Sequence, residues 1–347
     1  MRHKIRLGGE GVVTLKQIAE ACGMSVTQVS RALNGHSDVS ERTRKRVNAA
    51  ADALGYVKNI YAANLVSQTS NQIMVIIEGM EKDTNEAVSG NIFKLLQGIS
   101  SAASKLGFEP INYLKNRHNA IDYVEFCRSR YASGVIVYGF NFDDKQFLAL
   151  KDSSFPCVAV DILSEGKNNG CVVVNNVYYS QAAVSQMLDS GCRCVACIAG
   201  FEHAYVTVER MSGYAIALQA HGMKPNPELI RYADFDAEKA KKELSELLDT
   251  KPEIDGVFCM SDQMALGCLE LLNERGLRVP QDVCLFGFDG MYLARFVTPP
   301  LSTVEQDFYE KGASAIRLLA DIIQQKGKER TVVVPCKLCI RESSSPK

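Results

Sequence analysis

Eight runs of apolar residues, separated by segments with helical spacing, dominate the chain beyond residue 72. The runs are 73–77, 109–114, 134–139, 157–161, 171–174, 194–200, 256–260 and 282–288. Continuous apolar strands that alternate with helices are typical of parallel sheets covered on both faces. The runs are too numerous for one small sheet. The pattern therefore predicts an α/β fold with two doubly wound parallel lobes.

The size and composition of the chain exclude several classes of protein. A chain of 347 residues is longer than one core usually supports, so two or three domains are expected. No apolar run approaches the roughly eighteen residues of a membrane helix. The N-terminal stretch MRHKIRLGGEG has no apolar core of a secretory signal. We expect a cytoplasmic protein with no membrane partner.

The twelve cysteines are scattered and mostly lie inside apolar runs, where a reduced thiol behaves as a small apolar side chain. Two groups resemble metal motifs, namely Cys192, Cys194 and Cys197, and the pair Cys336 and Cys339. Zinc needs four ligands that converge. Strand alternation points Cys194 and Cys197 to opposite faces. We therefore predict no metal site and no cofactor.

The first 66 residues form a basic segment on an acidic chain. They hold ten Lys and Arg residues against five Asp and Glu residues, although the whole chain has a net charge of −1. A basic head on an acidic body indicates that the head meets an anion.

Two short helices around one glycine are predicted at the start of the chain. Thr14 and Gln17 form a capping box before one helix, and Ser25 and Gln28 form a second box after Gly23. Ser40 begins a third helix that Gly55 ends. The predicted inner faces are Leu15, Ile18, Ala19 and Cys22, then Val29, Ala32 and Leu33, then Val47, Ala50, Ala51 and Leu54. This is the pattern of a helix-turn-helix unit, although a small bundle with a solvated polar face has the same spacing.

The second helix would expose a set of side chains that can contact base edges and phosphates. These are Val26, Thr27, Gln28, Ser30, Arg31 and Asn34.

The stretches VTLKQIAEACGMSVTQVSRALNG and VSERTRKRVNAAADALGYVKN resemble the DNA-binding head of the lactose-repressor family. The resemblance implies that residues 1–57 form the head, that Val26, Thr27 and Arg31 read bases, and that a second group holds phosphates. That group is Thr14, Ser25, Ser30, Asn34 and Ser40. Phosphate contacts position such a head, and base contacts specify the sequence.

The resemblance makes residues 58–70 a hinge that becomes helical on DNA. It places Asn59 at the start of that helix, Ala62 close to the DNA, and Leu65 as a wedge between bases in the minor groove. The family's proline after the tyrosine is missing here, where Val57 and Lys58 stand. A plain flexible linker is the alternative.

Residues 71–347 resemble the type I periplasmic-binding-protein fold that this family uses as its effector domain. The matching pieces include Asp161, RMSGY, MSDQMALG, GFDG and IRES. The resemblance implies three crossings between lobes, which we place near Val174, Glu305 and Thr331. The first lobe would span about 71–175 and 306–331, and the second about 176–305 and 332–347.

The family's pocket falls between the lobes, at the carboxyl ends of the strands. By resemblance Arg210 grips ligand hydroxyls or carboxylates, Asp289 takes two sugar hydroxyls, and Ser261 stands where a sugar-binding asparagine is common. Glu78, His203 and Phe288 are further candidates. A surface charge and a strand-end cap are the alternatives for Arg210 and Asp289. The stretch 78–93 is longer than the family's loop and has no proline, so the ligand does not follow from analogy.

These features predict a DNA-binding repressor controlled by a small molecule, a sugar or a sugar derivative, bound between the two lobes. A purine or nucleoside is the alternative ligand, stacked on Phe201, Tyr205 or Phe288. An enzyme on the same fold is disfavoured, because the chain has no Walker A loop, no G-x-S-x-G and no H-E-x-x-H. The predicted DNA-binding head argues against a transport binding protein. Paired hinges imply a homodimer on a near-palindromic operator.

Overall fold

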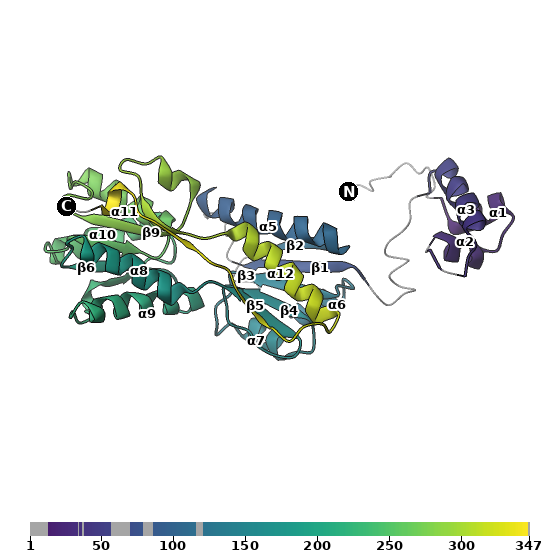
Figure 1. Cartoon of the computed structure of the whole chain (residues 1–347), viewed down its shortest axis with the longest axis horizontal. Coiled ribbons are helices and arrows are strands. Elements are labelled where there is room, and N and C mark those ends of the chain that lie inside the picture. The colour runs from purple at the N-terminus through teal and green to yellow at the C-terminus, as the bar shows by residue number, and fades with distance from the viewer. Residues whose placement is uncertain are drawn as a thin grey trace, which may run out of the picture. The chain divides into compact units, whose positions relative to one another are not determined.

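The computed structural model describes residues 13–33, 35–36, 38–56, 70–78, 86–115 and 121–345. Contacts divide the chain into two units, Met1–Thr69 and Ser70–Lys347 (Figure 1). The predicted site residues Asn34, Asn59, Ala62 and Leu65 lie outside the described residues.

The described residues of the first unit form three helices, α1 (Leu15–Cys22), α2 (Val26–Leu33) and α3 (Glu41–Leu54). Both predicted capping boxes are confirmed. Thr14 N donates to Gln17 Oε1 at 2.7 Å, and Gln28 N donates to Ser25 Oγ at 3.2 Å. The Ser40 hydroxyl caps α3 by accepting Thr43 N at 3.2 Å. These local bonds satisfy amide groups that a helix start leaves without partners.

Seven side chains form the core of the head: Ile18, Ala19, Cys22, Val29, Ala32, Val47 and Ala51. Leu54, which we predicted on the inner face of α3, is 40% exposed instead. It is the last residue of α3 before the left-handed Gly55, so it extends beyond the small core. The predicted face of α3 was therefore wrong at its end.

The first lobe of the second unit is a six-stranded sheet in the order β11-β5-β4-β3-β1-β2, with every pair parallel. Its strands are β1 (Gln72–Glu78), β2 (Glu109–Lys115), β3 (Gly134–Tyr138), β4 (Cys157–Val160), β5 (Asn169–Val173) and β11 (Thr331–Val333). Its helices are α5 (Glu86–Leu106), α6 (Tyr123–Arg128), α7 (Lys145–Asp152) and α12 (Phe308–Ile323).

Alternate residues of β1 enter the two cores on either side of this sheet. Ile73 and Val75 pack with α5 and α12, whereas Met74 and Ile76 pack with α6 and α7. The two helix layers are visible in Figure 1. Of the apolar runs predicted in this lobe, β1, β3, β4 and β5 are confirmed as buried strands, whereas the edge strand β2 is mostly half-buried or exposed.

The second lobe repeats the design in the order β12-β10-β9-β8-β6-β7, with only β12 antiparallel to its neighbour. Its strands are β6 (Val195–Ala199), β7 (Ile230–Tyr232), β8 (Gly256–Cys259), β9 (Cys284–Asp289), β10 (Ser302–Glu305) and β12 (Lys337–Cys339). Its helices are α8 (Asn176–Asp189), α9 (Tyr205–Ala220), α10 (Ala237–Thr250) and α11 (Asp262–Glu274), with short 3-10 turns at Pro227–Leu229, Tyr292–Arg295 and Glu342–Ser344.

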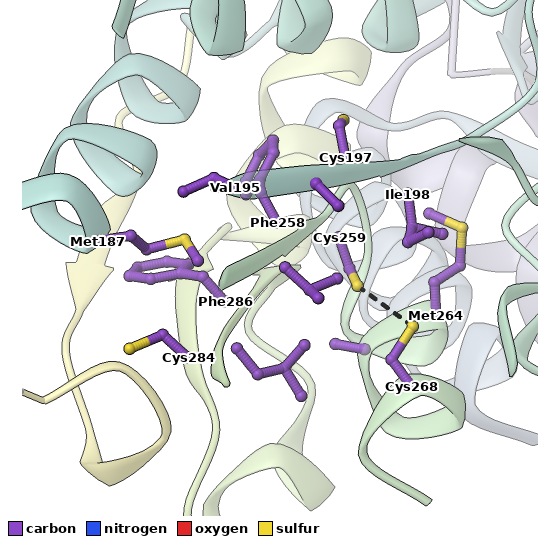
Figure 2. Close-up of a cluster of buried hydrophobic side chains, with 14 of the residues drawn as sticks. Met187, Val195, Cys197, Ile198, Phe258, Cys259, Met264, Cys268, Cys284 and Phe286 are labelled. Atoms are coloured by element: carbon purple, nitrogen blue, oxygen red, sulfur yellow. Dashed lines mark hydrogen bonds between the residues drawn. The ribbon is translucent and has the colours of Figure 1, made fainter. Parts of the chain in front are cut away.

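Cysteines help to fill the core of this lobe, as Figure 2 shows. Cys197, Cys259 and Cys268 are fully buried, and burial raises the pKa of the Cys197 thiol. Cys259 Sγ and Cys268 Sγ lie 3.6 Å apart. Cys194 is only half-buried. Among the described residues no group of three or more His, Cys, Asp or Glu side chains is placed to hold a metal ion.

Three connections join the two lobes. The first two lie at residues 174–175 and 306–307. The third lies at residues 334–336 and not at Thr331, because β11 continues to Val333 and pairs with β5 of the first lobe. Within the described part of the chain no helix is long and apolar enough to span a bilayer.

Candidate functional site

The outer face of α2 carries the side chains predicted to contact DNA. Val26 is 44% exposed, and Thr27, Gln28 and Arg31 are also exposed. Ser30 is half-buried. The inner residues Val29 and Ala32 hold the helix on the core of the head. The structure thus presents one polar face of α2 to solvent, as a recognition helix requires.

The Arg31 guanidinium forms an ion pair with Asp38, which lies between α2 and α3. Both side chains remain largely exposed, at 46% and 57%, so this pair is accessible from outside. Asp38 was not predicted from the sequence to be part of this face. An exposed pair of this kind contributes only about 0–1 kcal/mol, so it can open when Arg31 meets another anion.

Two of the basic side chains near α2 hold the head together. Arg44 donates to the carbonyl oxygens of His36 and Val39, and Arg46 donates to the Cys22 carbonyl at 2.8 Å. These bonds fix the turns that flank α2. The same side chains keep positive charge at the head surface, where it favours an anionic partner.

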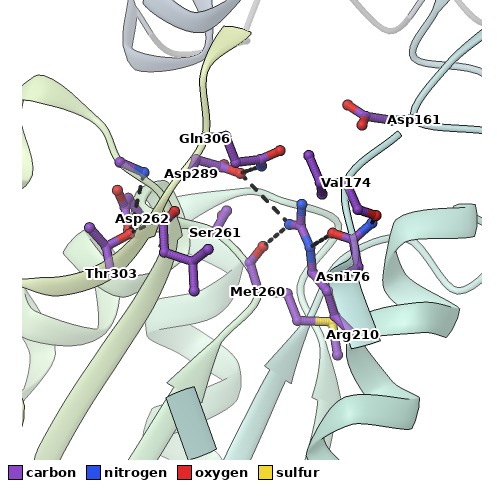
Figure 3. A network of polar contacts seen from close by, with 12 residues as sticks. Asp161, Val174, Asn176, Arg210, Met260, Ser261, Asp262, Asp289, Thr303 and Gln306 are labelled. Atoms are coloured by element: carbon purple, nitrogen blue, oxygen red, sulfur yellow. Dashed lines mark hydrogen bonds and ion pairs between the residues drawn. The ribbon is translucent and has the colours of Figure 1, made fainter. Parts of the chain in front are cut away.

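In the second unit, Arg210 lies at the centre of a buried polar network shown in Figure 3. Its Nε donates to Asn176 Oδ1 at 2.9 Å, and its Nη1 donates to the Met260 carbonyl. Nη1 also lies 3.7 Å from Asp289 Oδ1. The guanidinium stacks over the Phe288 ring, 3.7 Å from its centroid. Four contacts in different directions therefore fix the guanidinium.

Asp289 stands at the carboxyl end of β9, where the structure joins it to Arg210. Burial raises the pKa of Asp289 to about 6, although Arg210, Lys311 and a bond from Gln306 oppose the shift. Gln306 Nε2 donates to Asp289 Oδ1 at 2.7 Å. A carboxyl group with a strongly perturbed pKa at a strand end is a typical feature of a binding site.

Ser261 and the neighbouring Asp262 support this network. Ser261 is buried, and its hydroxyl caps α11 by accepting Met264 N at 3.2 Å. Asp262 is fully buried; it accepts Met291 N at 2.7 Å and the Thr303 hydroxyl at 2.6 Å. These bonds hold the turn that follows Asp289. Ser261 is thus near the site but is already engaged as a helix cap.

Of the other predicted ligand residues, Phe288 packs against the network, whereas Glu78 and His203 pair with side chains outside it. Phe288 is fully buried beneath Arg210, so its ring belongs to the core. Glu78 forms a buried ion pair with Lys115 at 2.8 Å, at the ends of β1 and β2. His203 is 57% exposed and lies 3.1 Å from Asp143, which belongs to the first lobe. Only Arg210, Phe288, Asp289 and Ser261 lie together.

Three members of the network were missed from the sequence: Asn176, Gln306 and Lys311. The sequence does contain a signal for Lys311, because this charged residue interrupts the apolar face of α12 between Phe308 and Ala315. A charged residue on the inner face of a buried helix is rarely without a charged partner. Asn176 and Gln306 had no comparable signal.

Comparison with known proteins agrees with these two units. The sequence pattern of bacterial regulatory proteins of the lacI family matches residues 14–59, and that of a periplasmic binding protein-like domain matches residues 184–344. The HTH-type transcriptional regulator CelR of Thermobifida fusca is 30% identical over 338 residues, which cover 95% of this chain and 98% of CelR.

Two solved structures are also similar. The transcriptional regulator CelR–cellobiose complex has a TM-score of 0.71 and 28% identity, over 95% of this chain and 99% of that chain. The Lac repressor dimer bound to operator and the anti-inducer ONPF has a TM-score of 0.83 over 96% of this chain and 100% of that chain. Its identity is 24%, so this likeness shows the fold alone. A relative at 30% identity over nearly all of both chains, together with the helix-turn-helix head, shows that the chain belongs to the lacI family and is a DNA-binding transcriptional regulator, not an enzyme.

Proposed function

We propose that the chain is a homodimeric repressor whose operator affinity is set by a small uncharged polyhydroxyl ligand, a sugar or a sugar derivative. The observation that carries the ligand class is the pair of the buried Arg210 and the partly exposed Asp289 in the second lobe. The CelR–cellobiose complex, a structure of a related regulator with a sugar, supports the same class.

The chemistry of the pair suits adjacent hydroxyl groups. A guanidinium presents donors only, and an ionised carboxylate presents acceptors only. A ligand hydroxyl can accept from Arg210 while its neighbour donates to Asp289. Each hydrogen bond to a charged group contributes roughly 1.5–3 kcal/mol when water is excluded. Lobe movement on binding would change the spacing of the two hinges in a dimer and so shift operator affinity.

A purine or nucleoside ligand is less well supported. That ligand needs an open aromatic face for stacking. Phe288 is covered by Arg210, and Phe201 contacts Phe235 edge-on at 5.8 Å between ring centroids. Tyr205 is half-buried and hydrogen-bonded to Glu209.

On the DNA side, we propose that Val26, Thr27 and Arg31 contact base edges and that Thr14, Ser25, Ser30 and Ser40 contact phosphates. The exposure of the α2 face supports the base readers. Thr14, Ser25 and Ser40 lie at helix starts, where amide groups and the helix dipole favour a phosphate. The roles of Asn34 and of the hinge residues Asn59, Ala62 and Leu65 stay predictions from the sequence.

An exposed apolar patch supports the dimer. Tyr292, Leu293 and Phe296 are 71%, 52% and 63% exposed, and the Tyr292 and Phe296 rings lie 4.9 Å apart. Large exposed apolar side chains that adjoin one another mark interaction surfaces more often than scattered ones do. We propose that a second copy of the chain covers this patch.

A thermal-shift series on the full-length chain tests the ligand class. Cellobiose, glucuronate and adenosine serve as an uncharged sugar, an acidic sugar and a nucleoside. Ligand at a hundred times its Kd stabilises by about 2.7 kcal/mol, which is readily measured. We expect a shift with an uncharged sugar that is lost in Asp289→Asn and kept in Asp321→Asn, an exposed aspartate on α12. A shift with adenosine alone would refute the sugar assignment.

A further inference from the structure

The start of α9, in the second lobe, makes direct contact with the first lobe. Phe142 N, in the loop after β3, donates to the His203 carbonyl oxygen at 3.3 Å. The rings of these two residues lie 5.9 Å apart, and His203 Nδ1 lies 3.1 Å from Asp143 Oδ2. The His203–Asp143 pair is largely exposed, so it contributes little by itself. The backbone bond, however, can form only while the two lobes touch.

Tyr205, the first residue of α9, contributes the apolar part of this contact. Its half-buried ring packs against the core of the first lobe that lies between the sheet and the helices α6 and α7. Aromatic side chains bury much apolar surface, and separation of the lobes would return the surface of this ring to water. Tyr205 therefore stabilises the arrangement in which the lobes touch.

A chain of hydrogen bonds leads from Tyr205 to the ligand site. The Tyr205 hydroxyl bonds to the Glu209 carboxylate, one turn further along α9. Asn176 Nδ2 donates to Glu209 Oε2 at 2.9 Å, and Asn176 Oδ1 accepts Arg210 Nε, a bond drawn in Figure 3. The carboxylate on one side and the guanidinium on the other fix the orientation of the Asn176 amide, because a flipped amide would face both with the wrong group. Burial raises the pKa of the Glu209 carboxyl group, and the bonds from Asn176 and Tyr205 oppose this rise because they stabilise the ionised form.

We propose that Tyr205 is a latch that holds the two lobes together in the arrangement of this structure, and that Glu209 and Asn176 connect this latch to Arg210. A ligand that shifts the guanidinium also shifts Asn176, which changes the position of the Glu209 carboxylate relative to the Tyr205 hydroxyl. Ligand binding and lobe closure then act on each other with the same coupling free energy. For its ligand alone, this inference rests on the proposed function.

The first test measures the latch by hydrogen–deuterium exchange on the full-length chain, read at single residues by mass spectrometry. The Phe142 amide donates across the lobes, so its exchange reports their separation. We expect this amide to be protected in the wild type and to exchange at least about tenfold faster in Tyr205→Ala. Val208→Ala is the control on the same helix, because Val208 is 46% exposed, and it should leave Phe142 unchanged. Protected amides in β3 and β8 show that both lobes remain folded in each variant.

The second test measures the connection between the latch and Arg210 with a double-mutant cycle on the same amide. Tyr205→Phe keeps the ring in the first lobe but removes the hydroxyl that bonds to Glu209. Arg210→Lys keeps the positive charge but removes the Nε donor to Asn176. We expect each variant to speed the exchange of Phe142. The double variant should exchange at least about threefold more slowly than the product of the two effects, because both changes break one chain of bonds.

The latch would be overturned by equal Phe142 exchange in the wild type and Tyr205→Ala, or by equal effects of Tyr205→Ala and Val208→Ala. Effects of Tyr205→Phe and Arg210→Lys that simply multiply in the double variant would overturn the connection to Arg210. Neither measurement contains a ligand. Calorimetry of the wild type with cellobiose is therefore a separate test, in which absence of binding would refute the proposed sugar ligand and leave both exchange results valid.

Discussion

Arg31→Ala is the sharpest test of how the head reads DNA. The side chain is 46% exposed on α2 and makes its ion pair with Asp38 only at the surface. Its loss should therefore cost the fold little. A lost bidentate base contact costs about 1–3 kcal/mol, which is roughly 5- to 150-fold in operator affinity. Asp38→Asn should strengthen binding to all sequences by less than about fivefold, because an exposed pair contributes at most about 1 kcal/mol.

The assay compares two duplexes, an operator selected from a random pool by the wild-type chain and a scrambled duplex of equal length. Fluorescence anisotropy over a salt series separates the phosphate contribution from the base contribution. Ser40→Ala is the control, because it should weaken both duplexes alike; its melting temperature must also be measured, since the hydroxyl caps α3. Equal losses of affinity on both duplexes for Arg31→Ala would refute its role as a base reader.

Three further predictions concern the second unit. Asp289→Asn should reduce affinity for the ligand found in the thermal-shift series at least about tenfold by calorimetry, with ligand-free operator binding unchanged; equal affinity would remove Asp289 from the site. Gly312→Ala should destabilise by about 1–3 kcal/mol in scanning calorimetry, because its Cβ would lie 2.1 Å from the Leu95 carbonyl oxygen of α5, whereas Gly90→Ala on α5 has nothing within 4 Å and should not destabilise. Leu293→Asp should shift the light-scattering mass from dimer to monomer, and an unchanged mass would place the dimer contact elsewhere.

The features predicted well from the sequence are those that depend on neighbouring residues. The capping boxes at Thr14 and Ser25 need partners only three positions away, so they can be seen in the sequence and were confirmed. The buried strands show as apolar runs for the same reason. The strand β7 at Ile230–Tyr232 was missed, because it has three half-buried or exposed edge residues and no apolar run.

The features predicted poorly are those assembled from distant parts of the chain. Lys311 and Asp161 are 150 positions apart and meet only because α12 packs on the sheet that carries β4. Phe288 was predicted as a ligand contact because it is an aromatic residue next to Asp289. Its ring instead packs under Arg210, which belongs to α9. Neither contact has a signature at one place in the sequence.

The first lobe is built from two separate segments of the chain, so the ribosome cannot complete it until the second segment has been made. Both α12 and β11 come after all of the second lobe except β12 and the turn at Glu342–Ser344. At about 5–20 residues per second, a ribosome needs roughly 15 to 60 s to reach α12, and until then the apolar face of α5 has no partner helix in its own chain. The head is finished by Tyr56 and can fold long before. A translation product that stops before α12 would therefore carry a complete DNA-binding head on a body whose first lobe lacks α12 and β11, and such products should depend on chaperones and proteases for their removal.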